Sequence, residues 1–230
     1  MSTFVLVHGA WHGAWCWERL TPELAQRGHV SIVMDLPCED PEAGLEEYAD
    51  AVIRAAADVA GPVILVGHSL GCLTIPLIPE RRPVERMVFL CGPVPEPGIS
   101  YTEWSAEQGF RVPSTPSAAM GEDLTSSWAD VDDARSAMYH DCPPEDAWWA
   151  FTRLRRQAAK PTLQAHPMQA WPDVPFSCIL AREDRLLDPA WARRDSAERL
   201  GAPAIEIDGS HSPFLAQPSL LAGILDDLAS

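Results

Sequence analysis

The residues Gly67-His68-Ser69-Leu70-Gly71 form a glycine-x-serine-x-glycine motif, a pattern that can present a serine hydroxyl as a nucleophile. The motif follows the apolar run Val63 to Val66 and precedes a helix-like segment, Leu70 to Ile78. Its glycines allow a sharp strand-to-helix turn, which exposes the hydroxyl while the new helix points backbone N–H groups at the same place. We therefore predict that Ser69 is a nucleophile rather than an ordinary serine in a glycine-rich turn.

A serine hydroxyl needs a base to take its proton, and after this motif the acid and then the histidine follow along the chain. His211 lies in the loop Asp208 to Pro213, directly after the last apolar run, Ala204 to Ile207. That loop would leave the sheet at the same edge as the serine turn. We predict that His211 is the base, rather than a surface histidine.

Three acidic residues are candidates for the group that orients this base, namely Glu183, Asp184 and Asp188. Asp184 follows the apolar run Phe176 to Leu180 in a short loop, and such a loop gives a rigid placement. Asp188 precedes Pro189 and could instead cap the next helix. We predict Asp184 as the acid and keep Asp188 and Glu183 as alternatives.

The segment His8-Gly-Ala-Trp-His-Gly13 could supply electrostatic stabilisation, because its glycines suit a loop that passes close over a ligand. An oxyanion formed at Ser69 would need two backbone N–H donors, one from the residue after the nucleophile and one from such a loop. We predict Leu70 and Ala10 as these donors. The histidines of this region are expected to pack and hydrogen-bond, since no clustered carboxylates or metal-ligand spacing accompany them.

Six short apolar runs recur between helix-like segments: Phe4–Val7, Val30–Met34, Val63–Val66, Met87–Leu90, Phe176–Leu180 and Ala204–Ile207. Continuous apolar runs are typical of strands that are covered on both faces, as in a parallel sheet. The sequence therefore predicts an α/β fold with a mostly parallel, doubly wound sheet of about six strands. The length of 230 residues favours one domain, 1–230.

The alternation breaks after the fourth run, between about Pro93 and Pro172, where no strand-like run is visible. We predict a helical lid over residues 93–172. Some of its aromatic side chains should fill its own core, and others should form an apolar acyl or alcohol pocket. The candidates for substrate contact are Trp11, Trp104, Trp128, Tyr139 and Trp148.

Charge and composition argue against nucleic-acid binding, membrane association and metal binding. The formal charge of −16 disfavours nucleic acid and anionic membrane surfaces as partners. No apolar run has the length that spans a bilayer, and the start of the chain lacks a signal-peptide pattern, so we expect a cytoplasmic protein. The six cysteines show no zinc spacing, and we expect free, buried thiols and no metal or other cofactor.

Three stretches, Phe4–Trp17, Gly67–Gly71 and Tyr139–Asp146, resemble the plant methylesterase and hydroxynitrile lyase family and its bacterial esterase-like relatives. The resemblance spans nearly the whole chain and implies the α/β-hydrolase fold. It also implies the same roles for Ser69, Asp184, His211, Ala10 and Leu70. The lyases of this family carry a threonine and a lysine where this chain has Gly9 and Ser212. A lyase must hold cyanide beside a cation, and Ser212 carries no charge, which favours an esterase.

We therefore expect a serine hydrolase that cleaves a small, apolar ester through an acyl-enzyme. The sequence leaves three alternatives open: a hydroxynitrile lyase, a lactone or carbon–carbon hydrolase of a polyketide-like substrate, and a non-catalytic receptor on the same fold. It leaves the oligomeric state open as well, and a homodimer is compatible with it.

Overall fold

A six-stranded parallel sheet with the strand order β2-β1-β3-β4-β8-β9 forms the centre of the molecule. The structure, a computed structural model, describes residues 1–113, 115–201 and 203–229. Each strand contains most of one predicted apolar run, so the predicted α/β fold is confirmed. The strands are β1 (Thr3–Val7), β2 (Val30–Val33), β3 (Val63–His68), β4 (Val84–Leu90), β8 (Phe176–Ala181) and β9 (Ile205–Ile207).

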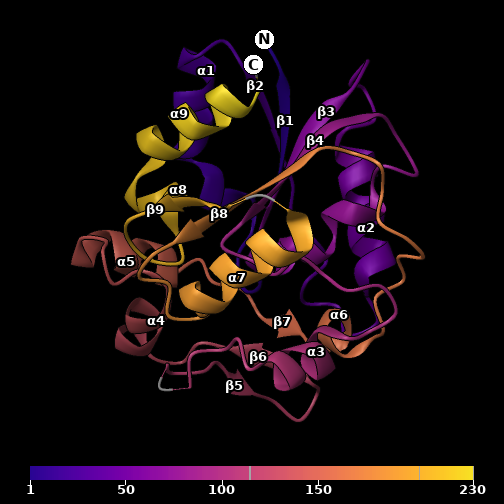
Figure 1. The fold of residues 1–230 in the computed structure, drawn as a ribbon. Helices are drawn as coiled ribbons and strands as arrows, with labels where there is room; N and C mark the ends of the chain where they lie inside the picture. Colours follow the sequence, from indigo (N-terminus) through magenta and orange to yellow (C-terminus); the bar gives the residue numbers. More distant parts are fainter. Residues whose placement is uncertain (114, 202, 230) are drawn as a thin grey trace.

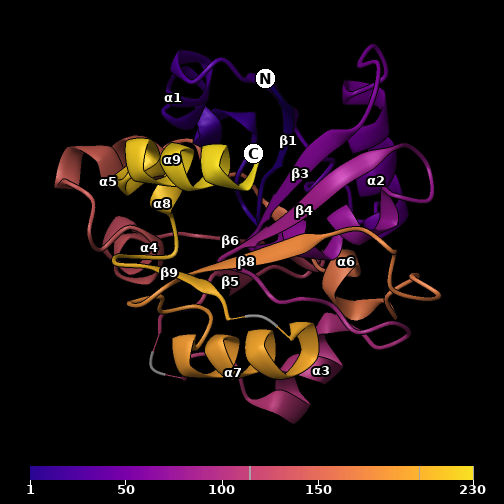
Figure 2. The ribbon, with the colours of Figure 1, turned by 45° about the horizontal axis from the view of Figure 1, so that its top comes forward.

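Helices cover both faces of this sheet, and alternate side chains of each strand therefore enter different cores. In β1, Phe4 and Leu6 pack in the core that α1 (Leu20–Gln26) and α9 (Pro218–Leu228) cover. Val5 and Val7 pack in the core that α2 (Leu45–Ala55) covers. α7 (Pro189–Leu200) packs on β8, and Figure 2 shows α9 and α7 on opposite sides of that strand.

Helix α2 shows how the sequence pattern sets this packing. Leu45, Tyr48 and Val52 recur at helical spacing and are fully buried, as the apolar stripe predicts. The helix begins after Gly44, whose N–H donates to the Glu47 carboxylate at 2.7 Å and so satisfies an otherwise free backbone donor.

The segment after Ser69 differs from the predicted continuous helix. It forms two short 3₁₀ helices, Ser69–Leu73 and Ile75–Leu77. Pro76 has no N–H to donate, and its ring disfavours the α conformation at Ile75, which explains the interruption.

Residues 93–172 lie at the carboxyl ends of the strands, in the lower part of Figure 1. They include several helices, and the structure adds a three-stranded antiparallel sheet that the prediction of a helical lid did not contain. These strands have two or three residues each and are rich in serine, threonine and alanine, so they leave no apolar run in the sequence. The lid elements are α3 (Tyr101–Gln108), β5 (Ala119–Met120), β6 (Thr125–Ser127), α4 (Val131–Met138), α5 (Pro144–Phe151), β7 (Gln157–Ala158) and α6 (Lys160–Leu163).

Two further short helices lie near the site, a 3₁₀ helix at Ala14–Trp17 and α8 at Pro213–Ala216. Over the part of the chain that the structure describes, no helix is both long and apolar enough to cross a bilayer.

Candidate active site

Ser69 stands at the tip of the turn between β3 and the first 3₁₀ helix, with φ at 50°. This left-handed conformation is strained for a residue with a side chain and is typical of a nucleophile turn. The flanking glycines permit it: a Cβ at Gly67 would lie 2.8 Å from the Gly71 carbonyl oxygen, and a Cβ at Gly71 would lie 2.5 Å from the Val7 carbonyl oxygen. Only glycine fits these two places, and the turn holds Ser69 at the edge of the sheet.

Two more glycines approach Ser69 from neighbouring strand ends. A Cβ at Gly9, after β1, would lie 2.8 Å from the Ser69 Cβ and equally close to the His68 ring. A Cβ at Gly92, after β4, would lie 2.9 Å from the Ser69 Cα. Backbone therefore encloses Ser69 on two sides.

His211 and Asp184 meet in a buried hydrogen bond. The His211 Nδ1 lies 2.7 Å from the Asp184 Oδ2, and each side chain is 3% exposed. The other carboxylate oxygen of Asp184 accepts the N–H groups of Leu186 and Leu187 at 2.8 and 3.0 Å. With its carboxylate fixed in this way, Asp184 holds the proton of His211 on Nδ1 and leaves Nε2 able to accept one.

The alternative acids occupy other places. Glu183 is exposed. Asp188 accepts the N–H of Ala190 at 2.9 Å and caps the start of α7. Among the three candidates, Asp184 is the one in contact with His211.

The loop that carries His211 is held by hydrogen bonds with His68, at the end of β3, and with the lid. The His68 Nε2 donates to the His211 carbonyl oxygen at 2.9 Å, and the two rings lie 4.8 Å apart. On the lid side, the Ser210 N–H donates to the Asp141 carboxylate and the Ser210 hydroxyl donates to the Met138 carbonyl, both at 2.9 Å. No local pattern in the sequence could reveal these supports, because they join residues 69 to 143 positions apart.

Two histidines fix the loop that carries Ala10. His8 accepts the N–H of Leu36 on Nε2 at 3.0 Å, so its Nδ1 carries the proton and donates to the Gly9 carbonyl oxygen at 2.8 Å. His12 donates from Nδ1 to the Ala10 carbonyl oxygen at 2.7 Å, while its Nε2 faces the Tyr139 hydroxyl. The peptide planes on both sides of Ala10 are thereby oriented.

These histidines act as neutral hydrogen-bonding groups. Burial lowers the pKa of His8 to about 4 and that of His12 to about 3, and it holds the pKa of His68 well below its ordinary value. In the described part of the chain, no group of three or more His, Cys, Asp or Glu side chains is arranged to hold a metal ion.

A cavity of about 490 Å³ opens beside Ser69. Ala10, Leu70, Trp11 and Trp128 line it together with lid residues. The Trp11 Nε1 donates to the Ser126 hydroxyl at 2.9 Å, and Trp128 packs edge-on against Trp11. The cavity thus joins the serine, both candidate oxyanion residues and two of the five aromatic side chains predicted to contact substrate.

The other three aromatic side chains lie elsewhere. Trp104 packs with Phe110 and Trp191 in a separate small core. Tyr139 is buried against His12, and Trp148 is 55% exposed on α5. We predicted from their aromatic character that these side chains line the substrate pocket. Instead, Trp104 packs in a core, Tyr139 supports His12 and Trp148 lies on the surface, so we do not assign them to substrate binding.

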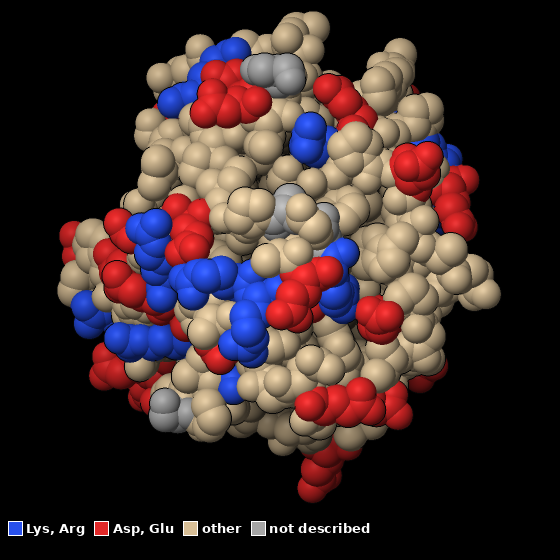
Figure 3. All heavy atoms as spheres, viewed as in Figure 1, with Lys and Arg blue, Asp and Glu red and all other residues tan. Residues whose placement is uncertain are grey.

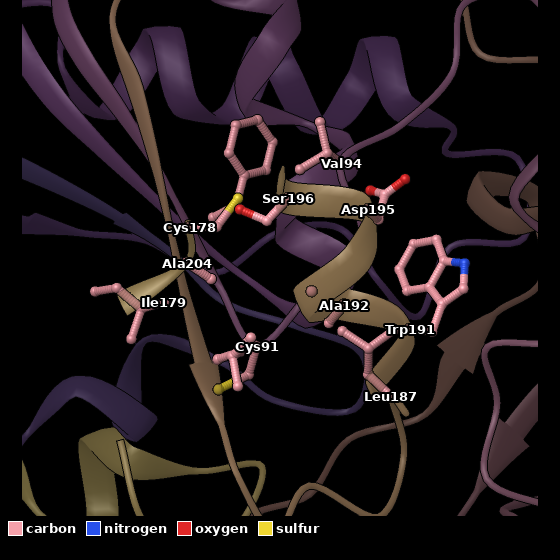
Figure 4. A pocket seen from close by; sticks show the side chains of 13 residues that line it. Cys91, Val94, Cys178, Ile179, Leu187, Trp191, Ala192, Asp195, Ser196 and Ala204 are labelled. Atoms are coloured by element: carbon pink, nitrogen blue, oxygen red, sulfur yellow. The ribbon is translucent and has the colours of Figure 1, made fainter. Parts of the chain in front are cut away.

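A second, much smaller space of about 20 Å³ lies between β8 and α7 (Figure 4). Its lining includes Cys178, Asp195 and Trp191 and none of Ser69, Asp184 and His211. It has room for little more than a water molecule.

The cysteines are all free, as predicted, and five of the six are buried. Burial raises the pKa of the Cys72 and Cys91 thiols well above the ordinary value. Neither thiol is a competing nucleophile at neutral pH.

Comparison with known proteins identifies the family of the chain. The sequence profile of the alpha/beta hydrolase family matches residues 4–224. Methylesterase 2 of Arabidopsis thaliana is 26% identical over 246 residues, which cover 95% of this chain and 92% of that protein. A pyrethroid hydrolase of Sphingobium wenxiniae is 25% identical over 252 residues, which cover 100% of this chain and 88% of that protein.

The crystal structure of polyneuridine aldehyde esterase shares the fold, with a TM-score of 0.81 at 22% identity and full coverage of both chains. Since the family profile spans nearly the whole sequence, the chain belongs to the alpha/beta hydrolase family, and its similar relatives include proteins named as esterases and methylesterases.

Proposed function

We propose that this protein is a carboxylic ester hydrolase in which Ser69 is the nucleophile, His211 the base and Asp184 the acid. The observation that carries the proposal is the buried 2.7 Å contact between His211 and Asp184, at the same sheet edge as the strained Ser69 turn. The names of the similar relatives, which include a methylesterase and a pyrethroid hydrolase, support an ester as the substrate.

The reaction has two steps. In the first, the Ser69 Oγ forms a bond to the ester carbonyl carbon while its proton passes to the His211 Nε2. The bond between that carbon and the alcohol oxygen then breaks, and His211 gives its proton to the leaving alcohol. In the second step, water attacks the acyl-enzyme, its proton passes to His211, and the acid leaves as Ser69 recovers its hydrogen.

The backbone N–H groups of Ala10 and Leu70 stabilise the negative oxygen that forms in each step. Each fixed donor of this kind lowers the activation free energy by a few kcal/mol, which corresponds to a rate increase of roughly a hundredfold or more. The hydrogen bond from His8 to the Gly9 carbonyl oxygen supports this role, because it orients the peptide that carries the Ala10 N–H before the substrate arrives. His12 fixes the adjoining peptide through the Ala10 carbonyl oxygen.

Two positions favour an esterase over a hydroxynitrile lyase. A threonine in place of Gly9 would place its Cβ 2.8 Å from the Ser69 Cβ, so the backbone would have to move to admit it. Ser212 is fully buried and carries no charge, whereas cyanide release needs a cation beside the leaving group.

The test is the mass of the intact protein after reaction with a serine-reactive fluorophosphonate, together with the hydrolysis of methyl and p-nitrophenyl esters. We expect one adduct on the wild type, none on Ser69→Ala and slow labelling of His211→Ala. Ser117→Ala is the matched control, since Ser117 lines the same cavity, and this variant should label and hydrolyse like the wild type.

Absence of an adduct on folded wild type, or equal labelling of Ser69→Ala, would overturn the assignment. Cyanide release from cyanohydrins without ester hydrolysis would identify a lyase instead.

A further inference from the structure

The cavity beside Ser69 contains one charged side chain among the described residues that line it, Arg111. Arg111 is exposed, and its guanidinium forms no hydrogen bond or ion pair with any residue that the structure describes. Several other arginines are paired with carboxylates: Arg182 and Arg193, for example, both bind Glu206, at 3.1 and 2.7 Å. Figure 3 shows that basic and acidic side chains are interspersed on this face of the molecule, with basic side chains in a band over α7 and acidic ones among them.

Tyr101, at the start of α3, is a second unpartnered donor in this cavity. Its hydroxyl has no hydrogen bond to a described residue. Burial raises the pKa of Tyr101, so the hydroxyl keeps its proton at neutral pH. The positive charge of Arg111 opposes this rise in the pKa of Tyr101, and the negative charge of Asp184 adds to it.

The backbone ties Arg111 to the loop of the triad acid. Arg111 forms an antiparallel bridge with Leu187, and the Asp188 N–H donates to the Phe110 carbonyl oxygen at 2.7 Å. The N–H of Leu187 is itself one of the donors that hold the Asp184 carboxylate. The Arg111 backbone therefore has a defined position relative to the catalytic groups.

Arg111 offers only donors, the Tyr101 hydroxyl can donate as well as accept, and the rest of the cavity lining carries no charge. Such a pair suits an acceptor that carries a negative charge. The chain as a whole has a formal charge of −16, so its average field repels anions, and an uncompensated cation in the substrate cavity provides a local exception.

We propose that Arg111 and Tyr101 form a carboxylate-binding subsite and that the substrates are esters that carry a second, free carboxylate. This inference rests on the proposed function, because the subsite would orient the ester whose carbonyl Ser69 attacks. It narrows the predicted apolar ester to one with an apolar body and an acidic end.

The experiment compares kcat/KM for acidic and neutral esters of matched shape. Monomethyl glutarate and monomethyl adipate carry the carboxylate on the acyl side, and their dimethyl esters are the neutral partners. The butyryl ester of glycolic acid carries it on the alcohol side, with the butyryl ester of methyl glycolate as its neutral partner. The pair that shows the larger preference identifies the side that faces Arg111.

We expect the wild type to prefer the acidic member of at least one pair and Arg111→Gln to lower that preference by about tenfold, mainly through KM. Arg111→Lys should keep part of the preference, and added salt should reduce it in the wild type. Arg54→Gln is the control, because Arg54 is an exposed arginine of α2 outside the cavity and its loss changes the net charge equally.

Equal preference in Arg111→Gln and the wild type, with neutral esters still hydrolysed, would overturn the subsite and leave the proposed function standing. Failure of the wild type to hydrolyse any ester would instead overturn the proposed function. If circular dichroism shows that Arg111→Gln is unfolded, Tyr101→Phe decides the matter: a lowered preference supports the subsite and an unchanged one overturns it.

Discussion

The hydroxyl of Tyr139, where α4 ends, donates to the His12 Nε2 at 2.7 Å, and this contact is one of those that link the lid to the loop beside Ser69. Because Tyr139 occupies Nε2, the proton of His12 lies on Nδ1 and is donated to the Ala10 carbonyl oxygen at 2.7 Å. A lid residue thus sets a tautomer, and the tautomer orients the Ala10–Trp11 peptide, which adjoins the peptide that carries the Ala10 N–H.

We predict that Tyr139→Phe lowers kcat about tenfold with little change in KM, because a shift of the Ala10–Trp11 peptide would move the adjoining Ala10 N–H, which acts on the transition state more than on the bound ester. Loss of the buried partner should also lower the free energy of unfolding by about 1–3 kcal/mol. Steady-state kinetics and urea unfolding measure the two effects. Tyr48→Phe is the control, since it removes a buried hydroxyl that accepts from the Gln157 amide at 2.9 Å and does not touch this loop. An equal fall in kcat for both variants would contradict the prediction.

Acid should destabilise the fold through the buried histidines. An unfolded histidine takes up a proton near pH 6.5, whereas folded His8 and His12, with their pKa lowered to about 4 and about 3, do not. Between these pH values the unfolded state binds more protons than the folded state. The free energy of unfolding therefore decreases as the pH falls from about 6.5 towards 4.

Urea unfolding from pH 7 to pH 4.5 tests this dependence. We predict a smaller slope for His12→Asn than for the wild type, by up to about one proton. Equal slopes in the two proteins would show that His12 takes up its proton as readily when folded as when unfolded.

Asp184→Asn should lower kcat about a thousandfold or more, because the amide would donate to His211 and favour the tautomer that cannot accept the serine proton. The fold should remain, since the amide oxygen can still accept from Leu186 and Leu187. The comparison variant is Asp188→Asn, which retains a good helix cap and should stay within a few fold of wild-type activity. A greater loss in Asp188→Asn would exchange the two assignments.

The close approach at Gly9 predicts a variant that is inactive and yet folded. In Gly9→Ala the new methyl group would lie 2.8 Å from the Ser69 Cβ, and the shift of Ser69 that relieves this contact should lower kcat/KM by about a hundredfold or more. Gly223→Ala, in α9, meets no atom closer than 3.9 Å and should keep activity while gaining about 0.5–1 kcal/mol in stability. Esterase assays and thermal unfolding of both variants check this, and full activity in Gly9→Ala would refute it.

Local patterns were enough to locate the strands of the main sheet and the loops of Ser69, Asp184 and His211. Buried parallel strands are continuous apolar runs, and their carboxyl ends meet at one edge, so residues far apart in sequence are expected to converge there. The structure brings Asp184 and His211 together in this way. The prediction depended on topology, which the order of the runs encodes.

The lid could not be predicted to the same extent. Its strands β5, β6 and β7 have only two or three residues each, too few for an apolar run, and their pairing depends on tertiary contacts. Composition does not tell an aromatic side chain that lines a cavity, such as Trp128, from one that fills a small core, such as Trp104. The supports from Tyr139 and Asp141 likewise join distant residues and leave no periodic signal.

The two glycines that press on Ser69 also decide how this scaffold can acquire new substrates. A Cβ at Gly9 or Gly92 would lie within 3 Å of Ser69 atoms, so side chains introduced at these strand ends would displace the nucleophile. The opposite wall is built from lid side chains such as Met120, Leu124 and Leu163, which are all more than half exposed and free to change size. Directed evolution of substrate range should therefore succeed in libraries confined to residues 93–172 and fail in libraries aimed at the strand ends.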